Sequence, residues 1–205
     1  MSRLRLLACL AVLQAAYAGG LGAQVRFRFI GADMYGGIVL TPNTEVGFAF
    51  GTRIGLLELG GTRLRAGAII DWWAAENTEL DVEVRDIVSG IDLWKDFGTS
   101  GWFRPFLGIG FGIHSVDVSP ASGQDFLQPV PAEAAQLEGF KPGASAFGGA
   151  TFRLSSTGAI WAIAEYRYNL VPDISNQEIR VGLRLLIRGS RGEGGGRGGS
   201  KAGRG

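Results

Sequence analysis

The sequence feature that most constrains the fold is a one-by-one alternation of apolar and polar residues, in segments of about ten residues. From Ile179 to Arg188, one face is wholly apolar and the other carries Arg180, Arg184 and Arg188. A period of two is that of a β-strand, because successive side chains point to opposite faces of a sheet. Eight such segments lie between Val25 and Arg188, so the sequence predicts an all-β domain.

The eight segments differ in how regularly they alternate. Five others follow the period closely, at residues 46–56, 63–72, 103–114, 143–153 and 160–170. The first segment loses its alternation after Phe29, and the fourth loses it after Val84. An extra residue in one strand of a pair shifts the period in this way, so we expect β-bulges at both places.

The lengths of the connections predict an up-and-down antiparallel barrel. Short links at residues 60–61, 98–101 and 155–158 follow every second segment, and longer links lie between them. Tight turns rich in Gly, Ser and Thr join neighbouring antiparallel strands. Eight strands joined in this order bring both termini and the short turns to one end, which we expect to be periplasmic. The opposite end then carries the loops near residues 42–44, 75–78, 119–139 and 172–176.

A closed sheet of this kind is either a soluble lipocalin-like barrel, with its apolar face inside, or a transmembrane barrel, with that face turned to lipid. Two features favour the transmembrane barrel. Many of the 34 glycines lie on the charged face, where they leave room for long side chains in a narrow lumen. Aromatic residues fall towards the strand ends, where girdles are expected: Trp72, Trp73, Trp94, Trp102, Phe103, Phe152 and Tyr168.

The two ends of the chain lie outside the predicted barrel. Residues 1–23 are organised as a secretory signal peptide: Arg3 and Arg5, an apolar run over 6–18, and a small-x-small cleavage pattern at 16–18. Cleavage is expected after Ala18 or Ala23, and residues 6–9 also resemble a lipoprotein processing box. We assign residues 24–188 to the barrel and the glycine- and arginine-rich residues 189–205 to a disordered tail.

Composition excludes several classes of function. The net charge of +1 argues against a nucleic-acid partner, which would require a strong basic excess. With one histidine, and its one cysteine inside the predicted signal peptide, the mature chain has no His/Cys metal cluster and no predicted cofactor. Glu79, Asp81 and Glu83 alternate onto one face, as either a calcium-attracting group or a solvated, salt-bridged stripe.

Three motifs resemble the strands of small outer-membrane barrels: residues 105–110 (PFLGIG), 165–168 (EYRY) and 180–184 (RVGLR). The family is the broad, porin-like group that includes opacity-type surface proteins and the barrel domains of outer membrane proteins A and X. This resemblance implies an eight-stranded antiparallel up-and-down transmembrane β-barrel. It also implies a setting of outer-membrane lipid and lipopolysaccharide, and folding by the barrel-assembly machinery. Such barrels often end on an aromatic residue, whereas here residues 186–188 lead into a tail.

The predicted lumen is lined by charged side chains from several strands: Arg63, Arg65, Asp71, Asp81, Glu83, Arg85, Arg104, Glu165, Arg167, Arg180 and Arg184. Most arginines fall towards the periplasmic strand ends and the acids at 71–83 fall towards the outside, so we expect a lumen basic below and acidic above. This pattern suits a narrow anion-preferring channel for small solutes. It also suits an interior filled by arginine–carboxylate pairs, which we favour because eight strands enclose little free space.

His114 beside Ser115 introduces a third interpretation, a lipid-A-modifying barrel enzyme. A serine nucleophile needs a base that takes its proton and an acid that orients the base. Neighbouring residues on a strand point to opposite faces, so His114 and Ser115 do not form that pair, although a serine from another strand is an alternative. The sequence therefore predicts a non-enzymatic outer-membrane protein with a structural, surface-contact or envelope-stabilising role. The channel, the enzyme and a soluble lipocalin-like binder are the alternatives.

Overall fold

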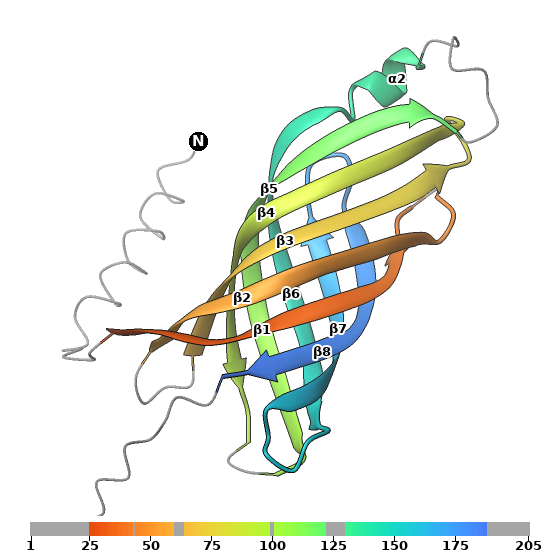
Figure 1. Cartoon of the computed structure of the whole chain (residues 1–205). Coiled ribbons are helices and arrows are strands. Elements are labelled where there is room, and N and C mark those ends of the chain that lie inside the picture. Colours follow the sequence, from red (N-terminus) through yellow and green to blue (C-terminus); the bar gives the residue numbers. More distant parts are fainter. Residues whose placement is uncertain (1–24, 43, 60–63, 99–100, 122–129, 188–205) are drawn as a thin grey trace, which may run out of the picture.

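Eight antiparallel strands close into a barrel in the computed structural model (Figure 1), which describes residues 25–42, 44–59, 64–98, 101–121 and 130–187. The elements are β1 (Val25–Leu40), β2 (Gly47–Leu59), β3 (Leu64–Asn77), β4 (Val82–Asp96), β5 (Phe103–Pro120), the short helix α2 (Ala132–Ala135), β6 (Gly139–Arg153), β7 (Ile160–Leu170) and β8 (Asn176–Leu186). The predicted signal peptide and tail lie outside the described residues.

Each strand pairs with its neighbour in sequence, and β1 pairs with β8 to close the barrel. In Figure 1 this seam is where β1, in orange, lies beside β8, in blue. The predicted eight-stranded up-and-down barrel is therefore confirmed. We call the end where β1 begins and β8 finishes the terminal end, and the opposite end, which carries α2, the far end.

The register shows where the alternation is interrupted. A shift between Phe27 and Gly31 of β1 confirms the bulge expected in the first strand. A second shift, between Gly55 and Leu57 of β2, was not predicted. The bulge expected in the fourth segment is wrong, because β4 pairs with β3 and β5 in one continuous register over Val82–Asp96.

The outer surface of the barrel carries an apolar band. Exposed side chains include Leu107, Ile109 and Phe111 of β5 and Val181 and Leu183 of β8. At the terminal end, Trp102, Phe103 and Phe152 form a cluster with ring centroids 5.2–5.9 Å apart. An apolar exterior with an aromatic rim is typical of transmembrane barrels and the reverse of a lipocalin. No helix within the described residues is long and apolar enough to cross a bilayer.

The polarity of the strands inverts towards the far end. There the inward side chains of β4 and β5 are apolar, as at Val82 and Val116, whereas Glu83, Arg85 and Asp117 face outwards. Buried apolar side chains from several strands, α2 and the β7–β8 loop form one cluster across this end: Val39, Ala49, Trp73, Ala75, Val82, Val84, Val116, Val118, Ala134, Val171 and Ile174. This inversion, and not a bulge, explains why the alternation of the fourth segment changes after Val84.

Candidate functional site

Arg53 of β2 lies at the centre of the lumen and is 1% exposed. Its guanidinium group donates to three carboxylates on three other strands. Nε lies 2.8 Å from Asp92 Oδ2, Nη1 lies 3.2 Å from Asp33 Oδ2, and Nη2 lies 2.6 Å from Glu165 Oε2. Because β1, β4 and β7 supply the acceptors, this one side chain ties together walls on different sides of the barrel.

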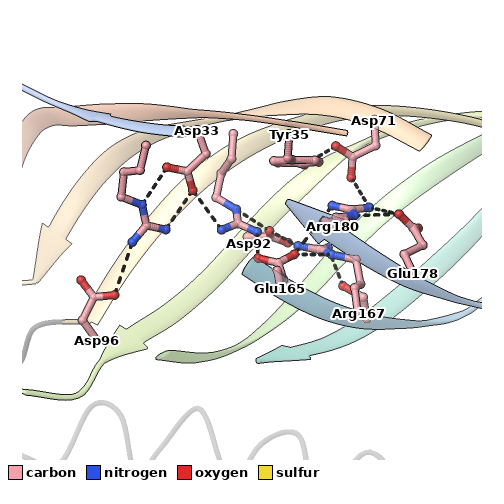
Figure 2. A network of polar contacts seen from close by, with 12 residues as sticks. Asp33, Tyr35, Asp71, Asp92, Asp96, Glu165, Arg167, Glu178 and Arg180 are labelled. Carbon is pink, nitrogen blue, oxygen red and sulfur yellow. Dashed lines mark hydrogen bonds and ion pairs between the residues drawn. The ribbon is translucent and has the colours of Figure 1, made fainter. Parts of the chain in front are cut away.

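Towards the far end, the network continues through Arg167 of β7 and Arg180 of β8. Arg167 Nη1 lies 3.1 Å from Asp92 Oδ1, and its Nε lies 3.1 Å from Glu165 Oε1. Arg180 donates to Asp71 Oδ2 across 2.9 Å and to Glu178 Oε2 across 2.7 Å. Figure 2 shows these groups as a continuous chain of contacts, with Tyr35 on Asp71 at one end. Glu178 also accepts a hydrogen bond from the buried Asn169.

Towards the terminal end, Arg184 and Arg65 complete the network. Arg184 donates to both oxygens of Asp33, through Nε at 2.7 Å and Nη2 at 2.8 Å, a paired geometry that strengthens a charged hydrogen bond. Arg65 Nη1 lies 2.6 Å from Asp96 Oδ2. Carboxylates thus accompany the arginines at this end of the lumen too, so the interior is not divided into a basic lower part and an acidic upper part.

Aromatic rings fill the space around the guanidinium groups. The Arg53 guanidinium carbon lies 4.8 Å from the Phe147 ring centroid and 5.2 Å from that of Trp94. The Arg167 guanidinium carbon lies 4.3 Å from the centroid of the same Phe147 ring, and that of Arg180 lies 4.6 Å from the Tyr35 ring centroid. Such contacts add cation–π attraction and exclude water from the ion pairs.

Inward-facing glycines provide the room for this network. A Cβ atom on Gly110 would lie 2.4 Å from both Asp92 Oδ1 and Ser145 Oγ, and one on Gly51 would lie 2.2 Å from Asp71 Oδ1. A side chain at either position would displace a carboxylate from its arginine. The glycines on the charged face therefore serve the purpose inferred from the sequence.

Two cavities that border this network are small. One cavity, beside Asp71, His114, Arg167 and Arg180, has a volume of about 10 Å³, and another, beside Asp33 and Arg184, is of the same size. Each has room for about one water molecule. Arg53 and its three carboxylate partners lie between the two cavities. The far-end apolar cluster lies beyond the cavity beside His114.

His114 of β5 belongs to a separate buried group near the far end. Its Nδ1 lies 2.6 Å from Asp86 Oδ2, and Trp73 Nε1 donates to the same oxygen across 3.0 Å. A Cβ atom on Gly143 would lie 2.5 Å from His114 Nε2, so the opposite edge of the ring packs against the backbone of β6. His114 thus serves as a buried partner of Asp86, whose own exposure is 0%.

We expect His114→Ala to lower the free energy of unfolding by about 2–3 kcal/mol, because it removes one of two partners of a fully buried carboxylate. Urea unfolding in detergent micelles, followed by tryptophan fluorescence, measures the change. Ser115→Ala, on the neighbouring outward-facing residue, is the control. Adding Asp86→Asn to His114→Ala should restore part of the lost stability. If His114→Ala and Ser115→Ala were equally stable, His114 would not be a stabilising partner of Asp86.

The structure places the predicted lumen residues in two groups. Seven of them face inwards or join the lumen network: Arg65, Asp71, Arg104, Glu165, Arg167, Arg180 and Arg184. Three others lie outside the lumen. Asp81 is exposed in the turn after β3, and Glu83 and Arg85 pair with each other on the outer face of β4 across 2.7 Å. Arg63 lies outside the described residues.

Four buried lumen carboxylates and the central Arg53 were not predicted from the sequence; the carboxylates are those of Asp33, Asp92, Asp96 and Glu178. The sequence did contain a signal for the acids of β4. Asp86, Asp92 and Asp96 lie at even-numbered positions, and so on one face of the strand, whereas Ile87 and Ile91 lie on the other face. The pattern was hard to recognise because the inward-facing residues of this strand change from apolar at Val84 to acidic at Asp86. Among the described residues, no group of three or more His, Cys, Asp or Glu side chains is arranged to hold a metal ion.

Comparison with solved structures shows the same fold in small outer-membrane barrels. Neisserial surface protein A (NspA) has a TM-score of 0.53 and 18% identity, covering 78% of this chain and 96% of that one. The N-terminal β-barrel domain of Pseudomonas aeruginosa OprF has a TM-score of 0.51 and 12% identity, covering 80% of this chain and all of the domain. Neither the family models nor the curated proteins matched the sequence.

These observations define the class of protein: a small, closed, eight-stranded β-barrel with an apolar exterior and a charged, filled lumen. The architecture is that of NspA and the OprF barrel domain. At these low identities, the likeness concerns the fold.

Proposed function

We propose that this chain is an outer-membrane protein whose barrel is a closed, non-conducting anchor. Its role is then structural, surface-contacting or envelope-stabilising, and is carried by the loops at the far end. The proposal rests above all on the lumen, in which Arg53 is held by carboxylates from three strands and both neighbouring cavities have room for about one water molecule.

The setting and orientation follow from the same proposal. Residues 1–23 direct export, and both termini lie in the periplasm. The apolar band contacts lipid, and the cluster of Trp102, Phe103 and Phe152 lies at the membrane interface, as aromatic girdles do. Outer-membrane lipid, lipopolysaccharide and the barrel-assembly machinery are the partners, and residues 189–205 form a periplasmic tail.

The alternative of an anion-preferring channel is less well supported, because a permeating ion would have to break the Arg53 pairs and then cross the far-end apolar cluster. We expect the protein to give no stable openings in planar lipid bilayers. Heat-modifiable gel mobility of the same sample checks that the inserted protein is folded. Repeated anion-selective openings from folded protein would contradict the closed lumen and favour the channel.

The geometry around His114 supports a non-enzymatic role. Ser145 lines the same small cavity, but its Oγ accepts a hydrogen bond from Arg167 Nη1 across 2.9 Å. A guanidinium group stays protonated and does not take the proton of a nucleophile. Mass spectrometry of lipid A from cells expressing the protein tests this point, with unchanged lipid A as the expected result.

A further inference from the structure

The small cavity beside His114 lies between the lumen network and the far-end apolar cluster. Its lining is rich in polar side chains from different strands: Asp71, His114, Ser145, Arg167, Asn169 and Arg180. A polar cavity with room for one water molecule is a site where water can satisfy buried groups that lack a protein partner. The hydrogen-bonding atoms around the cavity therefore decide whether it is a binding site.

One nitrogen of Arg180, a residue of the cavity wall, needs an acceptor. Arg180 is 2% exposed, and within the described part of the chain its Nη1 makes no hydrogen bond. Its ion-pair partner Glu165 Oε1 lies 3.8 Å from Nη1, beyond hydrogen-bonding distance. A buried donor that lacks an acceptor is costly, so an acceptor held in the cavity would stabilise the network.

His114 brings a second nitrogen to the same cavity. Its Nδ1 lies 2.6 Å from Asp86 Oδ2, so Nε2 lies on the other side of the ring. A Cβ atom on Gly143 would lie 2.5 Å from Nε2, and Gly143 also lines the cavity. The glycine thus leaves space beside this nitrogen. With Nδ1 bound to a carboxylate, Nε2 accepts a hydrogen bond in the neutral ring and donates one in the charged ring.

We propose that the cavity binds one long-lived water molecule, which accepts a hydrogen bond from Arg180 Nη1 and hydrogen-bonds to His114 Nε2. Water suits both protonation states of His114 because it donates as well as accepts, whereas a halide ion only accepts. The Asp71 carboxylate in the cavity wall also repels an anion. The water joins the Asp86–His114 pair to the lumen network, and its long stay rests on the closed barrel proposed above.

The sequence contains a single histidine, so isotope-labelled histidine gives one set of imidazole signals. The protein is expressed without a histidine tag and refolded into detergent micelles. Nuclear Overhauser contacts between the ring protons and water are then recorded in the laboratory frame and in the rotating frame. We expect cross-peaks between the His114 ring and water with opposite signs in the two frames, which is the signature of a bound water molecule. Gly143→Ala should abolish them by filling the space beside Nε2.

The matched control is Gly148→Ala, which adds the same methyl group to the outer face of β6, against the exposed Leu107 side chain. It should leave the cross-peaks unchanged. Ser145→Ala should also retain them, although it removes the hydroxyl group from the cavity wall. Their loss in Ser145→Ala would assign them to that hydroxyl group and overturn the water site.

The other outcomes separate this site from the closed lumen. Absence of cross-peaks in the parent protein would overturn the bound water alone. Cross-peaks of the same sign in both frames would reveal rapidly exchanging water, and would overturn both the long-lived water and the closed lumen. In crystals grown with bromide, an anomalous peak in the cavity would assign the site to a halide and overturn the water.

Discussion

Replacing Arg53 with methionine is expected to lower the free energy of unfolding by about 3–5 kcal/mol, because it removes the shared partner of buried carboxylates and leaves excess negative charge inside the barrel. Methionine has a similar length, so the change removes the charge more than the volume. Urea unfolding of the refolded barrel, monitored by tryptophan fluorescence and by heat-modifiable mobility, measures the effect.

Two further variants show whether buried charge causes the loss. Arg85→Met removes an arginine of the outer face, whose side chain is 47% exposed and pairs with Glu83, and should cost at most about 1 kcal/mol. Adding Glu165→Gln to Arg53→Met removes one stranded negative charge and should recover part of the stability. Equal losses for the Arg53 and Arg85 variants, with no recovery in the double variant, would show that the lumen network is not essential.

Replacing Gly182 with alanine is expected to prevent closure of the barrel. A Cβ atom at this position would lie 2.0 Å from Met34 O and 2.6 Å from Tyr35 Cα, both backbone atoms of the paired strand. Relief requires β1 and β8 to separate, so the cost should reach about 3 kcal/mol or more, at the upper end of overpacking effects. The measurement is the fraction of protein that shows heat-modifiable mobility after refolding into detergent or lipid.

Gly36→Ala is the matched control, since Gly36 lies on β1 at the same seam but has room for a Cβ atom. That variant should refold as well as the parent protein. If Gly182→Ala also refolded fully and with unchanged urea sensitivity, the close approach of β1 and β8 would not control closure.

The lumen network also bears on why the barrel adopts one register. Arg53 on β2 reaches acids on β1, β4 and β7, and Arg180 on β8 reaches Asp71 on β3. A shift of one residue in any of these strands would turn its charged groups towards lipid. Buried ion pairs are weak evidence for stability in themselves, but their geometry here favours a single pairing over its alternatives.

Much of the fold follows from the sequence alone. The period of two, the alternating lengths of the connections and the arginines of 180–188 are local features, and local features were enough to predict eight strands in up-and-down order. The same alternation predicts which residues of β5 and β8 face outwards, and it places Arg180 and Arg184 inside the barrel.

Only the tertiary structure decided which charged side chains contact each other, and where along the strands the inward-facing positions change from charged to apolar. Asp33 and Arg184 are 151 residues apart, and their contact depends on barrel closure, which no local pattern encodes. Glu83 and Arg85 looked like lumen residues because polar groups face inwards along most of the barrel. Near the far end, the interior is instead sealed by packed apolar side chains, so the same alternation there turns the charged side chains outwards.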